Sequence, residues 1–208
     1  MNIKIIDNFL NDEDFKEIAS LKLSKVGEYD IKVYHNNINK ENIVNTDCLS
    51  ELTVKRFQKN YHNKAMNLLR ELYPEKVDLY DFSEFHVVET GAKYKFPIHD
   101  DTPSKLLSGV IYINPEKNKG TIFYDNKKGD GKKSIEWKQN TAVFFARKER
   151  ETWHSYEGDG KSNRIALVYN LMTNKIKKVY QIEKKNYLFS ILRYKINPYL
   201  YRYFKIVL

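Results

Sequence analysis

The most informative stretch of the sequence is Phe96-Pro97-Ile98-His99-Asp100-Asp101. His99 and Asp101 stand two positions apart, so on an extended strand their side chains leave from the same face, while Asp100 points to the opposite face. An imidazole and a carboxylate on one face can bind one metal ion. Asp100 would replace Asp101 only if a bulge shifted the strand by one residue. His-x-Asp alone is a common pattern, and a metal site needs a third ligand.

The third ligand is sought among the five histidines of the chain, which are His35, His62, His86, His99 and His154. His62 lies on a helical pattern, and His35 lies in a polar, loop-like stretch. His86 lies among alternating strand residues, so we assign it to the wall of the β core. His154 follows a strand-like run at residues 141–146 and a charged loop, which lets the chain return opposite the first two ligands. We therefore predict that His154 completes the metal site.

Two imidazoles and one carboxylate form the facial triad that is typical of non-heme iron(II) oxygenases. Three ligands on one face of an octahedral ion leave three positions free for a bidentate cosubstrate and dioxygen. A closed set of four ligands would favour a structural metal, and a third histidine in place of the carboxylate would favour zinc hydrolysis chemistry. The ligand set therefore predicts oxygen chemistry at an iron(II) ion.

Arg164 follows His154 by ten residues and begins an alternating, strand-like run. In this run Arg164 shares one face with Ala166 and Val168, while larger apolar residues occupy the other face. If the small-residue face looks into a barrel, a guanidinium there is costly unless a carboxylate meets it in a fork geometry. A dicarboxylate ligand supplies that carboxylate, so we predict that Arg164 anchors one.

The rest of the chain predicts an α+β fold. Two helical patterns, one capped by Asn11 and one at residues 52–72 before Pro74, precede a series of short β-type runs. These runs are residues 80–89, 106–113, 121–124, 134–137, 141–146 and 164–172. Short strands at such intervals, with a turn at Gly129-Asp130-Gly131, favour a β-sandwich or barrel packed against helices.

Taken in order, these elements resemble the 2-oxoglutarate and iron(II)-dependent oxygenase superfamily, and within it the prolyl-hydroxylase-like branch. The resemblance covers about residues 1–173 and lies in residues 96–101, 108–114, 120–124, 141–145, 153–154 and 163–167. It implies a double-stranded β-helix, or jelly roll, whose N-terminal helices buttress one sheet. Substrate specificity is then expected in loops such as residues 26–47.

The resemblance also implies a set of cofactors and roles. Iron(II) would be held by His99, Asp101 and His154, which are thereby the catalytic residues, and 2-oxoglutarate would be bound by Arg164. Tyr112 would match a tyrosine that helps to bind the distal carboxylate of 2-oxoglutarate, or it is a core aromatic of its strand. With dioxygen as the oxidant, the implied activity is hydroxylation of a small molecule, a glycan or a protein side chain, with release of succinate and carbon dioxide.

Two other functions are compatible with the sequence. One is a non-catalytic, metal-binding jelly-roll module, against which the complete triad and Arg164 argue, since such a module has no physical need for all four. The other is a nucleic-acid-associated, demethylase-like oxygenase, whose support comes from basic residues near the C-terminus alone.

Positive charge is concentrated in residues 174–208. This segment holds nine Lys or Arg against one acid, Glu183, whereas the chain as a whole has a net charge of +9. We therefore divide the chain into an oxygenase domain, residues 1–173, and a basic, aromatic-rich, partly helical extension, residues 174–208. The extension could fold back over the domain, or it could contact an anionic membrane surface or a partner protein. Nucleic acid is the least favoured partner.

Cysteine content and hydropathy indicate the compartment. Cys48 is the only cysteine, which excludes an intramolecular disulfide framework. The sequence shows neither a signal-peptide pattern at its beginning nor a run approaching eighteen apolar residues. We therefore expect a cytoplasmic protein, with peripheral contact to a membrane surface as a further option.

Overall fold

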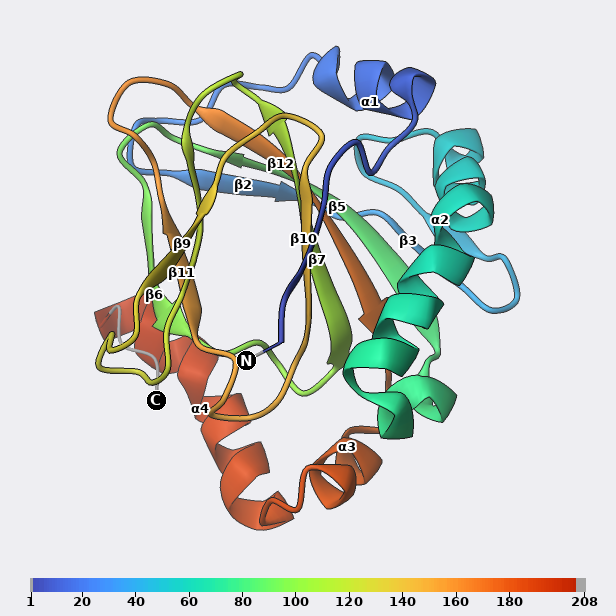
Figure 1. Cartoon of the computed structure of the whole chain (residues 1–208), viewed down its shortest axis with the longest axis vertical. Coiled ribbons are helices and arrows are strands. Elements are labelled where there is room, and N and C mark those ends of the chain that lie inside the picture. The colour runs from blue at the N-terminus through green and yellow to red at the C-terminus, as the bar shows by residue number, and fades with distance from the viewer. Residues whose placement is uncertain (1, 205–208) are drawn as a thin grey trace.

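The computed structural model describes residues 2–204 and is drawn in Figure 1. Its strands are β1 (Lys4–Ile6), β2 (Ile31–Tyr34), β3 (Asn37–Asn39), β4 (Val44–Asn45), β5 (Phe82–Thr90), β6 (Lys95–His99), β7 (Lys105–Asn114), β8 (Lys119–Phe123), β9 (Lys133–Glu136), β10 (Ala142–Ala146), β11 (His154–Glu157) and β12 (Arg164–Met172). Its helices are α1 (Asp12–Ala19), α2 (Glu51–Leu72), the 3-10 helix η1 (Pro74–Leu79), α3 (Ile176–Ile182) and α4 (Tyr187–Phe204).

The strands form two antiparallel sheets. The larger has eight strands in the order β1-β10-β7-β12-β5-β3-β4, with β2 also paired to β5, and the smaller has the order β6-β11-β8-β9. The two sheets lie opposite each other in Figure 1, with the helices outside. This architecture confirms the predicted mixture of helices and antiparallel sheets and is consistent with the predicted jelly roll.

Local sequence accounts for the two N-terminal helices. Asn11 caps α1 by accepting a hydrogen bond from the Asp14 backbone N–H at 2.8 Å, and Ser50 caps α2 by accepting one from Thr53 at 3.0 Å. The predicted apolar stripe of α2 packs on the larger sheet, and η1 begins at the proline that ends the pattern. The buried residues of α2 are Thr53, Val54, Phe57, Tyr61, Ala65, Leu68 and Leu69.

The central strands β7 and β12 separate the hydrophobic core from an internal cavity. On β12, Leu167, Tyr169 and Leu171 belong to the core shared with α2, while Arg164 and Ala166 line the cavity. Because side chains alternate along a strand, one strand can supply both the packing that stabilises the fold and the lining of a site.

The segment after β12 folds against the domain as α3 and α4, while the division at residue 173 remains a prediction. A buried ion network joins α3 to the rest of the chain, because the Glu183 carboxylate binds both Lys76 of η1 and Arg147. All three side chains are fully buried, and burial lowers the pKa of Lys76 to about 8.

Among residues 2–204, no helix has the length and apolar character needed to cross a bilayer.

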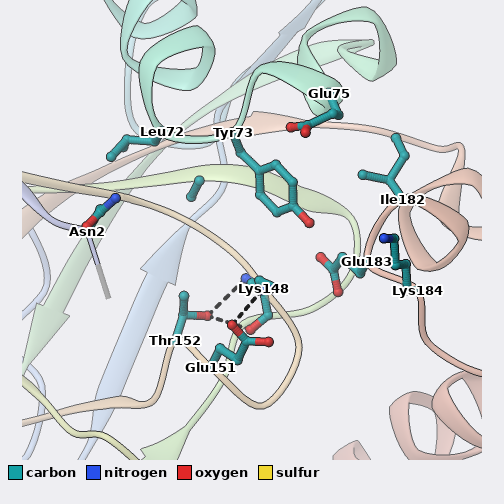
Figure 2. Close-up of a pocket in the computed structure, with 11 residues that line it drawn as sticks. Asn2, Leu72, Tyr73, Glu75, Lys148, Glu151, Thr152, Ile182, Glu183 and Lys184 are labelled. Carbon is teal, nitrogen blue, oxygen red and sulfur yellow. Dashed lines mark hydrogen bonds and ion pairs between the residues drawn. The ribbon is translucent and has the colours of Figure 1, made fainter.

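We expect Glu183→Gln to lower the free energy of unfolding by about 3–5 kcal/mol, because it leaves two buried cations without their counter-charge. The matched control is Glu151→Gln, since the Glu151–Lys148 pair is about half exposed and should contribute less than about 1 kcal/mol. Figure 2 shows both glutamates in the same region, with Glu183 facing the hydroxyl of Tyr73. Urea denaturation of the two variants tests the difference, and equal midpoints would contradict it.

Candidate metal and cosubstrate site

Strand pairing brings the three predicted metal ligands together. His99 ends β6 and His154 begins β11, and these antiparallel neighbours place the two histidines directly opposite each other. Asp101 follows β6 by two residues. One ligand atom from each of the three side chains lies within 4.8 Å of the others, and in the described part of the chain no other His, Cys, Asp or Glu cluster of this kind occurs.

Both imidazoles are oriented for metal binding. His99 Nδ1 lies 3.0 Å from the Pro97 carbonyl oxygen, and His154 Nδ1 lies 2.9 Å from that of Thr152. A carbonyl accepts only from a protonated nitrogen, so the lone pair of each ring is on Nε2, the atom left for a metal. Burial lowers the pKa of His99 to about 3 and also lowers the pKa of His154, so both rings are neutral at physiological pH.

The carboxylate of Asp101 is held from two sides. Ser108 Oγ donates a hydrogen bond to Oδ2 at 2.5 Å, and Lys105 Nζ lies 2.7 Å from Oδ1. Burial alone would raise the pKa of Asp101, but the positive charge of Lys105 and its hydrogen bond to the carboxylate outweigh it and hold the pKa below its usual range. Two neutral imidazoles and one ionised carboxylate therefore converge, and this donor set fits an iron(II) ion.

Asp100 takes a different direction from Asp101. Its Oδ2 accepts hydrogen bonds from Arg193 at 2.9 Å and from the Arg150 backbone N–H at 2.8 Å. The geometry therefore disfavours the alternative in which Asp100 replaces Asp101 as a ligand.

The three ligand side chains open into a cavity of about 430 Å³ between the two sheets. Arg164 lies on the wall of this cavity and is 4 % exposed. Its Cζ is 4.9 Å from the ring centroid of Trp137 and 4.8 Å from that of Tyr156, and its hydrogen bond to the Lys119 carbonyl is long, at 3.4 Å. Among residues 2–204, no carboxylate lies within ion-pair distance of this guanidinium. A buried cation of this kind fits an anionic ligand in the cavity.

Known structures share this architecture, although no family model and no curated sequence matches the chain. A prolyl-4-hydroxylase from Pseudomonas putida aligns with 83 % of this chain and 92 % of its own length, with a TM-score of 0.58 and 12 % identity. An oxidoreductase of the 2OG-Fe(II) oxygenase family from Burkholderia pseudomallei aligns over 82 % and 84 %, with a TM-score of 0.58 and 11 % identity.

A third structure is a prolyl hydroxylase from Trichoplax adhaerens in complex with a peptide fragment of the hypoxia inducible factor oxygen degradation domain. It aligns with 85 % of this chain and 86 % of its own length, with a TM-score of 0.55 and 14 % identity. The chain has the fold of the 2-oxoglutarate and iron(II)-dependent oxygenases. Two of these three structures are prolyl hydroxylases, the branch that the sequence was predicted to resemble.

Within this oxygenase fold, Thr90 and Tyr156 are cavity residues that sequence reasoning missed. Thr90 is the cross-strand partner of Arg164, and its buried hydroxyl has no hydrogen-bond partner in the described part of the chain. Tyr156 stands two positions after His154, which on a strand implies the same face, and its ring lies against Arg164. That two-residue spacing was the signal available in the sequence.

Tyr112 lies beside the cavity that holds the ligand cluster rather than among its lining residues. Its ring stacks on Trp137 at 4.4 Å, its hydroxyl donates to Thr121 Oγ1 at 3.1 Å, and it accepts from the Thr121 backbone N–H at 2.8 Å. The Tyr112 hydroxyl therefore has both an acceptor and a donor within the protein. The role of Tyr112 in binding 2-oxoglutarate stays a prediction. His86, assigned to the wall of the core, does line the cavity.

A second cavity, of about 590 Å³, lies near the end of α2 and is drawn in Figure 2. Its side chains include Tyr73, Lys148, Glu151 and Glu183, and the metal-ligand cluster is elsewhere. Size alone therefore does not identify the site of this oxygenase fold, whereas converging ligands and a buried cation do.

We expect Ser108→Ala to weaken iron(II) binding about 10-fold, because groups that hold a metal ligand typically change metal affinity by 10–100-fold. Competition with a chelator under anaerobic conditions measures the change. Ser134→Ala, on an exposed position of β9, is the control and should bind iron like the wild type. An unchanged affinity in Ser108→Ala would mean that the Ser108 hydroxyl does not orient Asp101.

Proposed function

We propose that the protein is an iron(II) and 2-oxoglutarate-dependent dioxygenase that hydroxylates its substrate. In this proposal His99, Asp101 and His154 hold the iron, and Arg164 binds the distal carboxylate of 2-oxoglutarate. The observation that carries the proposal is the buried guanidinium of Arg164, which shares one cavity with the three ligands and meets no carboxylate among the described residues. A dicarboxylate bound between Arg164 and the metal supplies a counter-charge to the guanidinium and oxygen ligands to the metal.

With iron(II), 2-oxoglutarate and dioxygen bound, such a site supplies oxidative decarboxylation of 2-oxoglutarate to succinate and carbon dioxide, and the second oxygen atom converts a substrate C–H bond to a hydroxyl group. The residues of this chain contribute binding and orientation. The two histidines present neutral Nε2 atoms, Ser108 and Lys105 fix the Asp101 carboxylate, and Arg164 sets the direction of the cosubstrate. Apolar side chains such as Val110 and Phe145 limit access of water.

The substrate enters a part of the cavity that carries charges of both signs. Glu84, His86 and Lys105 line it, and Asn170 donates to Glu84 at 3.0 Å while its own buried oxygen has no partner among the described residues. Because buried polar groups need hydrogen-bond partners, this lining supports a substrate with polar groups near the reacting carbon. A small molecule, a glycan and a protein side chain all meet that requirement.

Succinate formation tests the proposal directly. The protein is incubated with iron(II), ascorbate, 2-oxoglutarate and oxygen, with and without mixtures of peptides, sugars and small metabolites. The expected result is succinate that increases when a substrate is present and that falls to background in His99→Ala. A protein that binds iron and 2-oxoglutarate but forms no succinate with any mixture would favour the non-catalytic module.

A further inference from the structure

Helix α4 turns an apolar side toward solvent. Successive residues of an α-helix are about 100° apart, so residues spaced by three, four or seven positions share one side. The large exposed side chains on this outer side are Leu188, Phe189, Leu192, Ile196, Tyr199 and Tyr203, and the first two are 74 % and 76 % exposed. Isolated exposed apolar residues are common, but a row of them along a helix indicates a binding surface.

The inner side of α4 is polar and is held by ion pairs. Arg193 is buried and lies 2.9 Å from a carboxylate oxygen of both Asp100 and Glu149. Ser190 Oγ donates to Glu149 at 2.7 Å, and the Tyr201 hydroxyl lies 3.2 Å from that of Tyr94. An ordinary surface helix buries its apolar side and exposes its polar side. In α4 this arrangement is reversed, so the outer side is suited to a partner that is apolar at the point of contact.

The surroundings of that outer side are strongly basic. Within residues 174–204 the one acidic residue is Glu183, and it is buried in the ion network described above. The hairpin between β8 and β9 carries four further exposed lysines, together with the exposed Asp125 and Asp130. The exposed basic residues of the two regions are Lys127, Lys128, Lys132, Lys133, Lys177, Lys178, Lys184, Lys195 and Arg202.

We propose that α4 docks the protein onto an anionic lipid bilayer, with the helix lying in the plane of the interface. Apolar and aromatic side chains enter the boundary between headgroups and acyl chains, while flanking lysines and arginines bind the negative surface. The helix lies on the bilayer rather than across it, because α4 contains Pro198 and, in the part of the chain that the structure describes, no helix is apolar and long enough to span.

Charge distinguishes a bilayer from a second copy of this chain. A symmetric dimer through α4 would bring two equally basic surfaces together, and like charges at an interface are unfavourable. An anionic lipid surface complements both the charge and the apolar row. The proposal does not depend on the proposed oxygenase activity, because it rests on α4 and its neighbours alone.

Docking would also fix the position of the candidate metal site relative to the bilayer. The inner side of α4 borders a small cavity of about 160 Å³ that reaches His99 and Asp101. The docked surface and the metal ligands therefore lie on opposite sides of the same helix. If the proposed function holds as well, the substrate is a molecule presented at the membrane surface.

Flotation of the full chain with lipid vesicles tests the docking. We expect binding to phosphatidylcholine vesicles that contain phosphatidylglycerol, weak binding to phosphatidylcholine alone, and loss of binding as salt is raised. The triple variant Lys177→Gln/Lys178→Gln/Lys195→Gln should bind about 100-fold more weakly, since each charge near the surface changes affinity about fivefold. Leu188→Ser/Phe189→Ser/Leu192→Ser should lose binding to the same vesicles.

Two exposed residues outside the C-terminal helices, one on α2 and one beside β4, provide a matched control. Leu52 is 78 % exposed and Ile43 is 60 % exposed, so Leu52→Ser/Ile43→Ser removes comparable apolar surface away from α4 and should bind vesicles like the wild type. Circular dichroism confirms that each variant is folded. Absence of binding to anionic vesicles, equal binding to neutral ones, or self-association that disappears in the serine triple variant would overturn the proposal. None of these readouts needs iron or 2-oxoglutarate, so failure of docking and failure of the oxygenase proposal are separable.

Discussion

Arg164→Ala is expected to raise the 2-oxoglutarate concentration needed for half-saturation about 100-fold to 1,000-fold, while iron(II) affinity stays within about twofold of the wild type. Removing one partner of a buried, hydrogen-bonded charge pair costs about 2–5 kcal/mol, and each 1.4 kcal/mol is a factor of ten in affinity. The guanidinium is 4 % exposed, so little water screens the interaction. Anaerobic calorimetric titration of 2-oxoglutarate into the iron-loaded protein measures the effect.

Two controls sharpen this prediction. Arg164→Lys keeps the charge but loses the planar fork, so its 2-oxoglutarate affinity should lie between those of wild type and Arg164→Ala. Arg70→Ala, on the exposed surface of α2, removes an arginine far from the cavity and should leave affinity unchanged. If Arg164→Ala bound 2-oxoglutarate as tightly as the wild type, the dicarboxylate would have to sit elsewhere.

Asp101→Ala is expected to weaken iron(II) binding by more than about 100-fold, which exceeds the usual effect of groups that only support a ligand. The variant removes the single anionic donor of the cluster and leaves two neutral imidazoles. Iron content after desalting, together with chelator competition, measures the loss. Succinate formation should fall to background in the same variant.

The neighbouring carboxylate provides the matched control. Asp100→Asn should keep iron affinity near that of the wild type, since its partners are Arg193 and the Arg150 backbone rather than the ligand cluster. His35→Ala is the corresponding control for the two histidine ligands. It should also keep iron affinity near that of the wild type, because His35 is exposed and lies outside the cluster. Loss of iron from Asp100→Asn but not from Asp101→Ala would show that Asp100, and not Asp101, is the carboxylate ligand.

Periodicity allowed much of the fold to be predicted. The four-residue spacing of apolar residues predicted α2 to within one residue at its start, and alternation along β12 separated the core side from the cavity side. Strands β2, β3 and β4 were not predicted, because they have only four, three and two residues and residues 26–47 looked like loop. Their conformation depends on pairing with β5 and on Asn36, whose side chain accepts hydrogen bonds from the backbone N–H groups of three residues, 47–49.

The candidate site was predictable where a spacing implied a shared face and was missed where it depended on strand register. The pattern His99-x-Asp101 placed two side chains together, but the unpartnered hydroxyl of Thr90 beside Arg164 follows only from the pairing of β5 with β12. Likewise the sequence predicted a helical basic extension without indicating which side would face the protein. Asp100 and Glu149 decide that orientation by binding Arg193.

The most direct test of the central claim is an anaerobic titration of the protein with iron(II) and then 2-oxoglutarate, followed in the visible spectrum for the weak charge-transfer band of the chelate. The experiment needs no substrate, and it is run on wild type, His99→Ala and Arg164→Ala. We predict a band in the wild type that is absent from His99→Ala and that needs about 100-fold more 2-oxoglutarate in Arg164→Ala. A folded, iron-loaded wild type that shows no band at saturating 2-oxoglutarate would contradict the oxygenase assignment.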